Sequence, residues 1–242
     1  MEQEASNDVS KALIAALEHD PRIDLHRYPV QASLQQGKLL LQGAVENIAA
    51  KKLFLAVAFE LAGDSIVLDR LRVSASNGEE DGTLRVGVVN ALQREPALSE
   101  YSLRLMRDGK RETVHKAEDD AALIDISVED GVVSLSGHVG SLTHRRLAEV
   151  LVWWVAGCQA VNNQLEVVPP EEDNDGELTD AVRMAFEKDP LVHASQLLVS
   201  AHDGTITLEG FVASKEEKKL AALDAWYVPG VREVVDHIET RD

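Results

Sequence analysis

The chain has 242 residues, of which 45% are hydrophobic, and a formal net charge of −18 at pH 7. This acidity disfavours general binding to nucleic acid or anionic lipid, because the phosphates would be repelled. The single cysteine, Cys158, excludes an intramolecular disulfide and a cysteine-based metal cage. No apolar run approaches the roughly 18 residues that a membrane-spanning helix needs. The N-terminus lacks the basic and apolar regions of a signal peptide, so we expect a cytoplasmic protein.

One stretch recurs three times along the chain. Two glycines stand six residues apart in Asp203–Gly210, in Asp130–Gly137 and, more loosely, in Gln36–Gly43. Apolar and other residues alternate within each copy, a pattern typical of a half-buried strand. Landmarks that repeat at fixed offsets predict repeated structural units. We therefore predict three tandem copies of one small module.

Each copy should begin with a short helix. Its apolar residues step by four, which places them on one stripe. They are Val9, Leu13 and Leu17, then Leu84, Val88 and Leu92, then Leu178, Val182 and Phe186. A proline follows each stripe, at Pro21, Pro96 and Pro190. Proline disfavours helical conformation in the residue before it, so each helix should end there.

A hairpin should follow the first helix. Its first strand is predicted at about 30–35, 123–129 and 196–202, and the Asp-Gly or Gln-Gly turn joins it to the recurring strand. The second glycine of each copy shares the apolar face of the recurring strand. These glycines are Gly43, Gly137 and Gly210. A glycine there leaves room for another backbone, and we expect the second helix to cross the sheet at that point.

The second helix should begin at a capping residue and end at a glycine. Good N-caps stand four residues after each of those glycines, at Asn47, Ser141 and Ser214. Helix-ending glycines stand twenty residues after Gly43, Gly137 and Gly210; they are Gly63, Gly157 and Gly230. A closing strand is predicted at about 65–73, 160–168 and 232–240.

The predicted fold class is α+β, with three α-β-β-α-β modules in which two helices pack on a small mixed sheet. The modules should span residues 1–74, 81–169 and 175–242, separated by acidic stretches that are typical of linkers. The second module carries an insertion at about 99–120. Within it, Asp108-Gly109 between two alternating runs predicts an additional β-hairpin.

These landmarks resemble the BON domain, a bacterial family named for osmotically inducible and nodulation proteins. The matching motifs in the third copy are Asp189-Pro190, the run Asp203–Val212 and Pro229–Val231. The second copy carries similar motifs, whereas the first departs from them at Gln36 and Asp64. The resemblance implies non-enzymatic binding modules, often linked to phospholipid surfaces and osmotic stress.

We therefore expect a non-enzymatic binding or scaffold protein of the bacterial stress response, which binds a phospholipid surface or a protein partner. The alternative is a sensor of a small ligand or a monovalent cation, because a cytoplasmic relative of the family is a potassium sensor. The histidines form no metal-binding spacing, and no P-loop or nucleophile motif occurs in a suitable context. We expect no catalytic residue, cofactor or metal.

Aromatic residues recur sixteen positions after the second glycine, at Phe59, Trp153 and Trp226. This position points away from the apolar stripe of the second helix. We therefore expect these side chains to be partly exposed, or buried against the first helix or a neighbouring module. The next position, Trp154 and Tyr227, shares the face of the stripe and is predicted to be core. For the first three residues, packing and a lipid or protein contact both stay open.

The insertion also holds the main basic cluster of this acidic chain. Its members are Arg104, Arg107, Lys110, Arg111 and Lys116. They belong either to a solvated hairpin paired with acidic neighbours or to a docking site for an acidic partner or headgroup.

Overall fold

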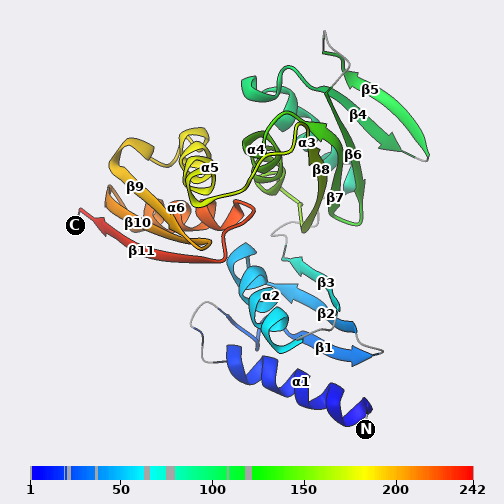
Figure 1. Ribbon diagram of the computed structural model, residues 1–242, viewed down its shortest axis with the longest axis vertical. Helices are drawn as coiled ribbons and strands as arrows, with labels where there is room; N and C mark the ends of the chain where they lie inside the picture. The colour runs from blue at the N-terminus through cyan, green and yellow to red at the C-terminus, as the bar shows by residue number, and fades with distance from the viewer. Residues whose placement is uncertain are drawn as a thin grey trace. The chain divides into compact units, whose positions relative to one another are not determined.

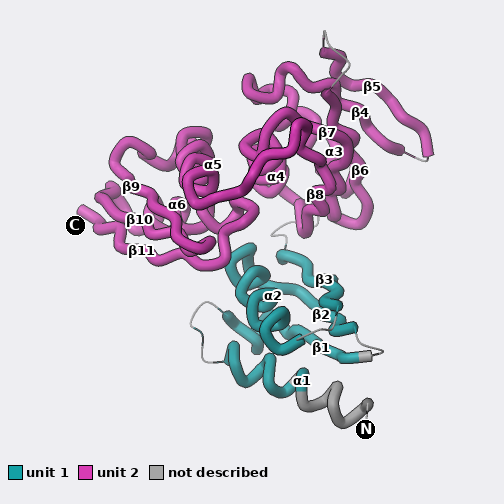
Figure 2. Tube along the Cα trace, in the orientation of Figure 1, with its two compact units in different colours: residues 1–74 teal, residues 75–242 magenta. Residues whose placement is uncertain are grey.

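The computed structural model describes residues 2–18, 20, 23–35, 38–62, 66–74, 80–107, 109–117 and 122–241. The chain divides into two compact units, Met1–Ser74 and Ala75–Asp242 (Figure 2). In the described part, no helix has the length and apolar character needed to cross a membrane. Some sequence predictions fall outside the described residues: the first proline, the first turn and the first helix-ending glycine, at Pro21, Gln36–Gly37 and Gly63.

The N-terminal unit has the order α-β-β-α-β (Figure 1). Its elements are α1 (Glu2–Leu17), β1 (Val30–Gln35), β2 (Lys38–Val45), α2 (Ile48–Ala62) and β3 (Ile66–Val73). Strand β2 is central, antiparallel to β1 and parallel to β3. Leu13 of α1, Leu39 of β2 and Phe54 of α2 are fully buried, so the core lies between the two helices and one face of the sheet.

The end of the chain, residues 174–241, repeats this order and pairing, and we call it the C-terminal module. Its elements are α5 (Asp175–Lys188), the 3₁₀ turn η2 (Ala194–Gln196), β9 (Leu197–His202), β10 (Thr205–Val212), α6 (Lys215–Tyr227) and β11 (Glu233–Thr240). Strand β10 is antiparallel to β9 and parallel to β11. The sheet order β11-β10-β9 leaves β9 at an edge of the sheet.

Residues 80–169 form the hairpin module, which adds two strands to the same plan. Its elements are α3 (Asp81–Gln93), the 3₁₀ turn η1 (Pro96–Leu98), β4 (Ser102–Arg107), β5 (Lys110–His115), β6 (Leu123–Glu129), β7 (Val132–Val139), α4 (Leu142–Trp153) and β8 (Ala160–Val167). The predicted inserted hairpin is confirmed, because β4 and β5 are antiparallel. Strand β4 also pairs in parallel with β6, which gives the order β5-β4-β6-β7-β8.

The structure confirms the α+β class and places the strands close to their predicted positions. Strands β1 and β6 have the predicted bounds, and β9 begins one residue later than expected. The predicted helix stripes face the cores, since Leu84, Val88 and Leu92 are at most 1% exposed. The period-four stripe and the period-two alternation therefore identify the two kinds of element correctly.

The second glycine of each copy makes room for a strand and not for a helix. The backbone φ angles of Gly43, Gly137 and Gly210 are 137°, 118° and 125°, in a region that other residues rarely adopt. A Cβ atom on Gly43 would lie 2.6 Å from the carbonyl oxygen of Pro29, and one on Gly210 would collide with the carbonyl oxygen of Gln196. The prediction that the second helix crosses at this glycine is wrong, because the approaching backbone leads into the neighbouring antiparallel strand.

The predicted N-caps of the second helices are confirmed. Each accepts the backbone N–H three residues further on, at 3.0 to 3.1 Å; they are Asn47, Ser141 and Ser214. The helix ends differ from the prediction, because α4 and α6 stop several residues before Gly157 and Gly230. These two glycines instead lie in the turns into β8 and β11, with φ angles of 88° and 97°.

Candidate binding surfaces

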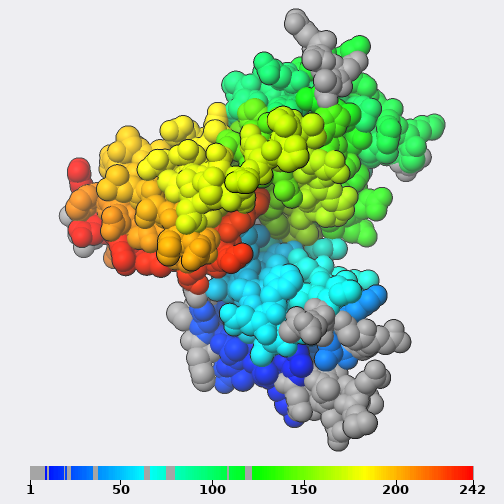
Figure 3. Space-filling view, viewed as in Figure 1, coloured from blue at the N-terminus to red at the C-terminus, as the bar shows by residue number. Residues whose placement is uncertain are grey.

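Helix α4 joins the two modules of the second unit, which form one continuous surface (Figure 3). Arg146 of α4 is only 4% exposed. Its Nη2 donates to both carboxylate oxygens of Asp173 at 2.6 Å, and its Nε donates to the carbonyl oxygen of Pro229 at 3.0 Å. One side chain therefore binds both the segment between the modules and the turn before β11.

Two further contacts cross the same interface. The indole N–H of Trp154 donates to Oδ1 of Asp224 on α6 at 3.0 Å. The Nζ of Lys188, at the end of α5, donates to Oε1 of Glu95 at 2.7 Å, and Glu95 is only 6% exposed. In each ion pair of this interface one partner is buried, Arg146 or Glu95, while the other, Asp173 or Lys188, remains partly exposed to water.

The predicted aromatic residues have different environments. Trp153 and Trp226 are 7% and 4% exposed, whereas Phe59 is 61% exposed. The ring of Trp153 packs on that of Tyr227 across the interface, with 5.9 Å between the ring centroids. Trp154 and Tyr227 are half-buried at this interface, so the prediction that they are core residues is wrong. Contact with the neighbouring module involves Trp153, Trp154 and Tyr227, and helical geometry within one module does not contain that information.

Asp224 is a buried carboxyl group beside a second carboxyl group. Burial, together with a hydrogen bond and charge repulsion from Asp189, raises the pKa of Asp224 to about 8. Burial also raises the pKa of Tyr227 to about 12, with a contribution from Asp224. Sequence reasoning missed this group, although one signal was present: Asp224 occupies the four-residue stripe between Leu220 and Val228.

The inserted segment is anchored to the start of α4 by Tyr101. Its hydroxyl accepts the backbone N–H of Gly140 at 2.9 Å and shares a hydrogen bond with Nδ1 of His144 at 2.6 Å. Burial lowers the pKa of His144, so the neutral form of its ring is favoured. Among the residues that the structure describes, no group of three or more acidic, histidine or cysteine side chains could hold a metal ion.

The basic cluster divides into a paired arginine and an exposed hairpin tip. Arg104 makes a bidentate ion pair with Asp125, at 2.7 and 2.9 Å, on the sheet of its own module. Arg107, Lys110 and Arg111 are exposed at the end of the hairpin. Arg107 lies directly opposite Lys110 in the β4–β5 register, an arrangement of like charges that destabilises a strand pair.

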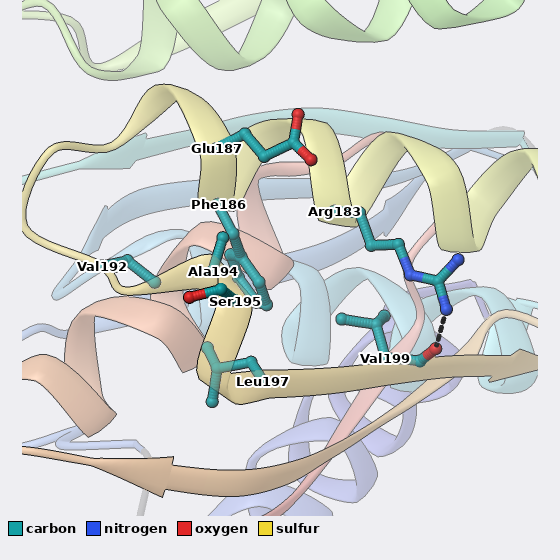
Figure 4. A pocket seen from close by; sticks show the side chains of 8 residues that line it. All are labelled: Arg183, Phe186, Glu187, Val192, Ala194, Ser195, Leu197 and Val199. Carbon is teal, nitrogen blue, oxygen red and sulfur yellow. Dashed lines mark hydrogen bonds between the residues drawn. The ribbon is translucent and has the colours of Figure 1, made fainter.

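A hollow of about 470 Å³ opens between α5 and β9 in the C-terminal module (Figure 4). Phe186 of α5 and Leu197 of β9 point toward each other across it, while Glu187 points away (Figure 4). At one end Arg183 donates to the carbonyl oxygen of Val199 at 3.4 Å. Sequence analysis did not identify this hollow, because its lining residues belong to the ordinary apolar pattern of a helix and a strand.

Comparison with known proteins identifies the family. A model of the BON domain matches residues 111–169 and 174–242, which is more than half of the chain and accounts for two of the three expected copies. A structure of the C-terminal domain of CdsD, a structural protein of the type III secretion system of Chlamydia trachomatis, is 13% identical, covers 97% of this chain and 98% of its own, and has a TM-score of 0.25. A second CdsD structure is 15% identical, with coverages of 97% and 92% and a TM-score of 0.24. No curated protein matches the chain. The chain belongs to the BON domain family.

Proposed function

We propose that the chain is a non-enzymatic binding protein of the bacterial stress response, in which the joined modules form a scaffold and the hairpin tip docks an acidic protein partner. The observation that carries this proposal is the tip formed by Arg107, Lys110 and Arg111. The three exposed basic side chains form a local positive patch at the end of the hairpin, and such a patch favours a partner surface that offers carboxylates. A partner that contacts the tip alone meets mainly its local positive charge, because charges more than about 8 Å apart in water are largely screened.

A protein partner fits this tip better than an anionic membrane does. Trp153 and Trp226, which could otherwise insert between lipids, are buried inside the second unit. A flat anionic surface would meet the acidic remainder of the chain as well as the tip, and the net charge is −18. A protein can offer carboxylates to the tip alone.

We also propose that the N-terminal unit is a third, divergent BON module. It has the same element order and the same strand pairing as the C-terminal module. Gly43 shares both the positive φ and the close carbonyl contact of Gly210. Gly43→Ala should therefore destabilise the N-terminal unit as strongly as Gly210→Ala destabilises the second unit, and denaturant unfolding of each variant measures both effects.

The docking proposal is tested by site-specific photocrosslinking in extracts of the source cells. A photoreactive amino acid at Lys110 should capture a discrete protein, whereas the same group at the exposed Lys215 should not. The triple change Arg107→Glu, Lys110→Glu and Arg111→Glu should abolish capture by a crosslinker at Gly109. A matched control reverses three exposed charges elsewhere, with Arg94→Glu, Lys215→Glu and Lys219→Glu, and should retain capture.

Vesicle flotation tests whether the hairpin tip binds an anionic lipid surface instead of a protein. Vesicles of phosphatidylcholine with phosphatidylglycerol should not carry the chain upward. Flotation that depends on phosphatidylglycerol and is lost in the Arg107, Lys110 and Arg111 triple variant would overturn the protein-partner proposal in favour of a lipid surface.

A further inference from the structure

The two modules of the second unit differ at one equivalent strand edge. In the hairpin module, β6 has β7 on one side and the inserted strand β4 on the other. In the C-terminal module, β9 pairs with β10, and no other described strand pairs with its second side. The same module thus occurs twice, once with its edge covered and once with it open.

The residues at the two edges correspond one to one. A shift of 73 residues superimposes the recurring glycines, since Gly204 and Gly210 follow Gly131 and Gly137 by that number. Ile124 and Ile126 of β6 therefore correspond to Leu197 and Val199 of β9. All four are buried on the core side of their sheets.

Strand β4 shows what an occupant of this edge does. Leu103 lies beside Ile124, and Leu105 lies beside Ile126, in parallel register. Neighbouring residues on parallel strands share a face of the sheet, so both leucines point toward the core of the hairpin module. Leu103 is only 1% exposed.

The hollow of the C-terminal module lies where the leucines of β4 would fall. It borders Leu197 and Val199, the counterparts of the two isoleucines, and Phe186 of α5 (Figure 4). With about 470 Å³ it has room for apolar side chains. The space that the hairpin module fills with its own strand is therefore open in its counterpart.

One outer position of β9 is apolar where β6 carries a charged residue, while the next two outer positions, Ser200 and His202, are polar as in β6. The counterpart of Asp125, which pairs with Arg104 of β4, is Leu198, and Leu198 is 66% exposed. An unpaired strand edge attracts another strand, and proteins usually protect such edges with charges, which Leu198 does not supply. Arg183 gives partial protection, because it occupies the carbonyl oxygen of Val199 from the edge side at 3.4 Å.

We propose that the open edge of β9 binds an extended segment of a partner protein, which adds as a parallel fourth strand. The segment carries two apolar residues two positions apart, which enter the hollow, and an apolar residue between them beside Leu198. Main-chain hydrogen bonds supply affinity, and the alternate side chains supply specificity. This site is separate from the hairpin tip and does not depend on it.

A peptide derived from β4 tests the proposal with the full chain. The probe is fluorescein-labelled Tyr-Ser-Leu-Val-Leu-Met-Arg, the sequence of residues 101–107 with valine at the position of Arg104. Fluorescence polarisation should show saturable binding. Leu198→Asp should weaken it by at least about tenfold, and Arg183→Ala should strengthen it by freeing the carbonyl group of Val199. Val86→Asp, at a residue of the hairpin module that is 61% exposed, should leave it unchanged.

The native peptide, with arginine at the middle position, gives the reciprocal result. It should bind Leu198→Asp more tightly than it binds the wild-type chain, because the change restores the pair that Arg104 makes with Asp125. Leu198 is exposed, so the variant should fold, which circular dichroism checks. The proposal would be overturned if the valine peptide showed no saturable binding to the wild-type chain. It would also be overturned if Leu198→Asp changed the affinities of the valine peptide and the native peptide by the same factor.

Amide exchange locates the bound peptide. The backbone groups of alternate residues in an antiparallel pair point away from the partner strand, and the Arg183 bond shows that those of Val199 do. The valine peptide should therefore protect the amides of Val199 and Ala201 and leave β11 unchanged, whereas the amide of Leu197 already donates to the carbonyl oxygen of Ala194. Protection at β11 or at the hairpin tip instead would place the peptide elsewhere and refute the assignment.

Discussion

Single residues set the backbone geometry of each module, and Gly210 is the clearest case. Gly210→Ala should destabilise the second unit by about 2 kcal/mol or more, because the new Cβ meets the carbonyl oxygen of Gln196 and the φ of 125° is strained for alanine. Urea unfolding measures the change. Gly82→Ala is the control: its Cβ would have no atom within 4 Å, and alanine favours helix α3, so stability should stay equal or rise. Equal stability of both variants would contradict the steric account.

The titration of Asp224 makes stability depend on pH. The pKa of this carboxyl group is about 8 in the folded chain, against an ordinary value of 3.8. Between these pH values the unfolded chain releases the proton while the folded chain retains it, so the contribution of Asp224 to stability falls as pH rises. It is fully present below about pH 4 and lost above about pH 8.

Asp224→Asn should remove this dependence, because an amide cannot ionise and its oxygen can still accept the Trp154 indole N–H. The melting temperature of the variant minus that of the wild type should increase by a few degrees between about pH 5 and about pH 9. Asp180→Asn, at an exposed carboxylate of α5, is the control. A difference that is constant over this range would show that Asp224 is already ionised in the folded chain.

At the scale of elements, the contact of α4 with the C-terminal module depends on Arg146. Arg146→Met should reduce the stability of the second unit by about 2 kcal/mol, the value of a charge-assisted hydrogen bond. It should also separate the unfolding of the two modules, which differential scanning calorimetry detects as a broadened or split transition. The adjacent Arg145 lines a hollow against β8, so Arg145→Met should leave a single transition. A single sharp transition in both variants would mean that other contacts suffice.

The elements themselves could be predicted well from the sequence. Strand β6 could be placed because the alternation from Leu123 to Glu129 ends at an Asp-Gly turn, which are both local signals. The contact between modules could not be predicted, because Arg146 looks like a surface residue of a helix until a second module covers it, and the place of Asp224 on an apolar stripe does not reveal its partner. The hollow beside β9 was missed for a related reason: Leu197 and Val199 have the pattern of an ordinary buried strand, and only the comparison with β6 and β4 shows what is absent beside them.

At the scale of the whole molecule, the chain divides at Ser74 and Ala75 into two compact units. The first unit has one sheet, the second has two, and each unit has its own buried residues, so each should unfold as a separate cooperative domain. A fragment of residues 75–242 should keep the unfolding midpoint that the second unit has in the full chain. A marked fall of that midpoint in the fragment would show that the N-terminal unit contributes to its stability.

Strand β4 is covalently part of the module whose edge it covers. A tethered ligand competes at an effective concentration of the order of millimolar, which a free competitor in a cell rarely reaches. The β6 edge is therefore permanently saturated, and its occupancy does not respond to the surroundings. Strand β9 has no such tether among the described strands, so its occupancy would follow the abundance of its ligand. The hairpin module would then serve as a fixed structural part, whereas the occupancy of the C-terminal module would report the concentration of the ligand of β9.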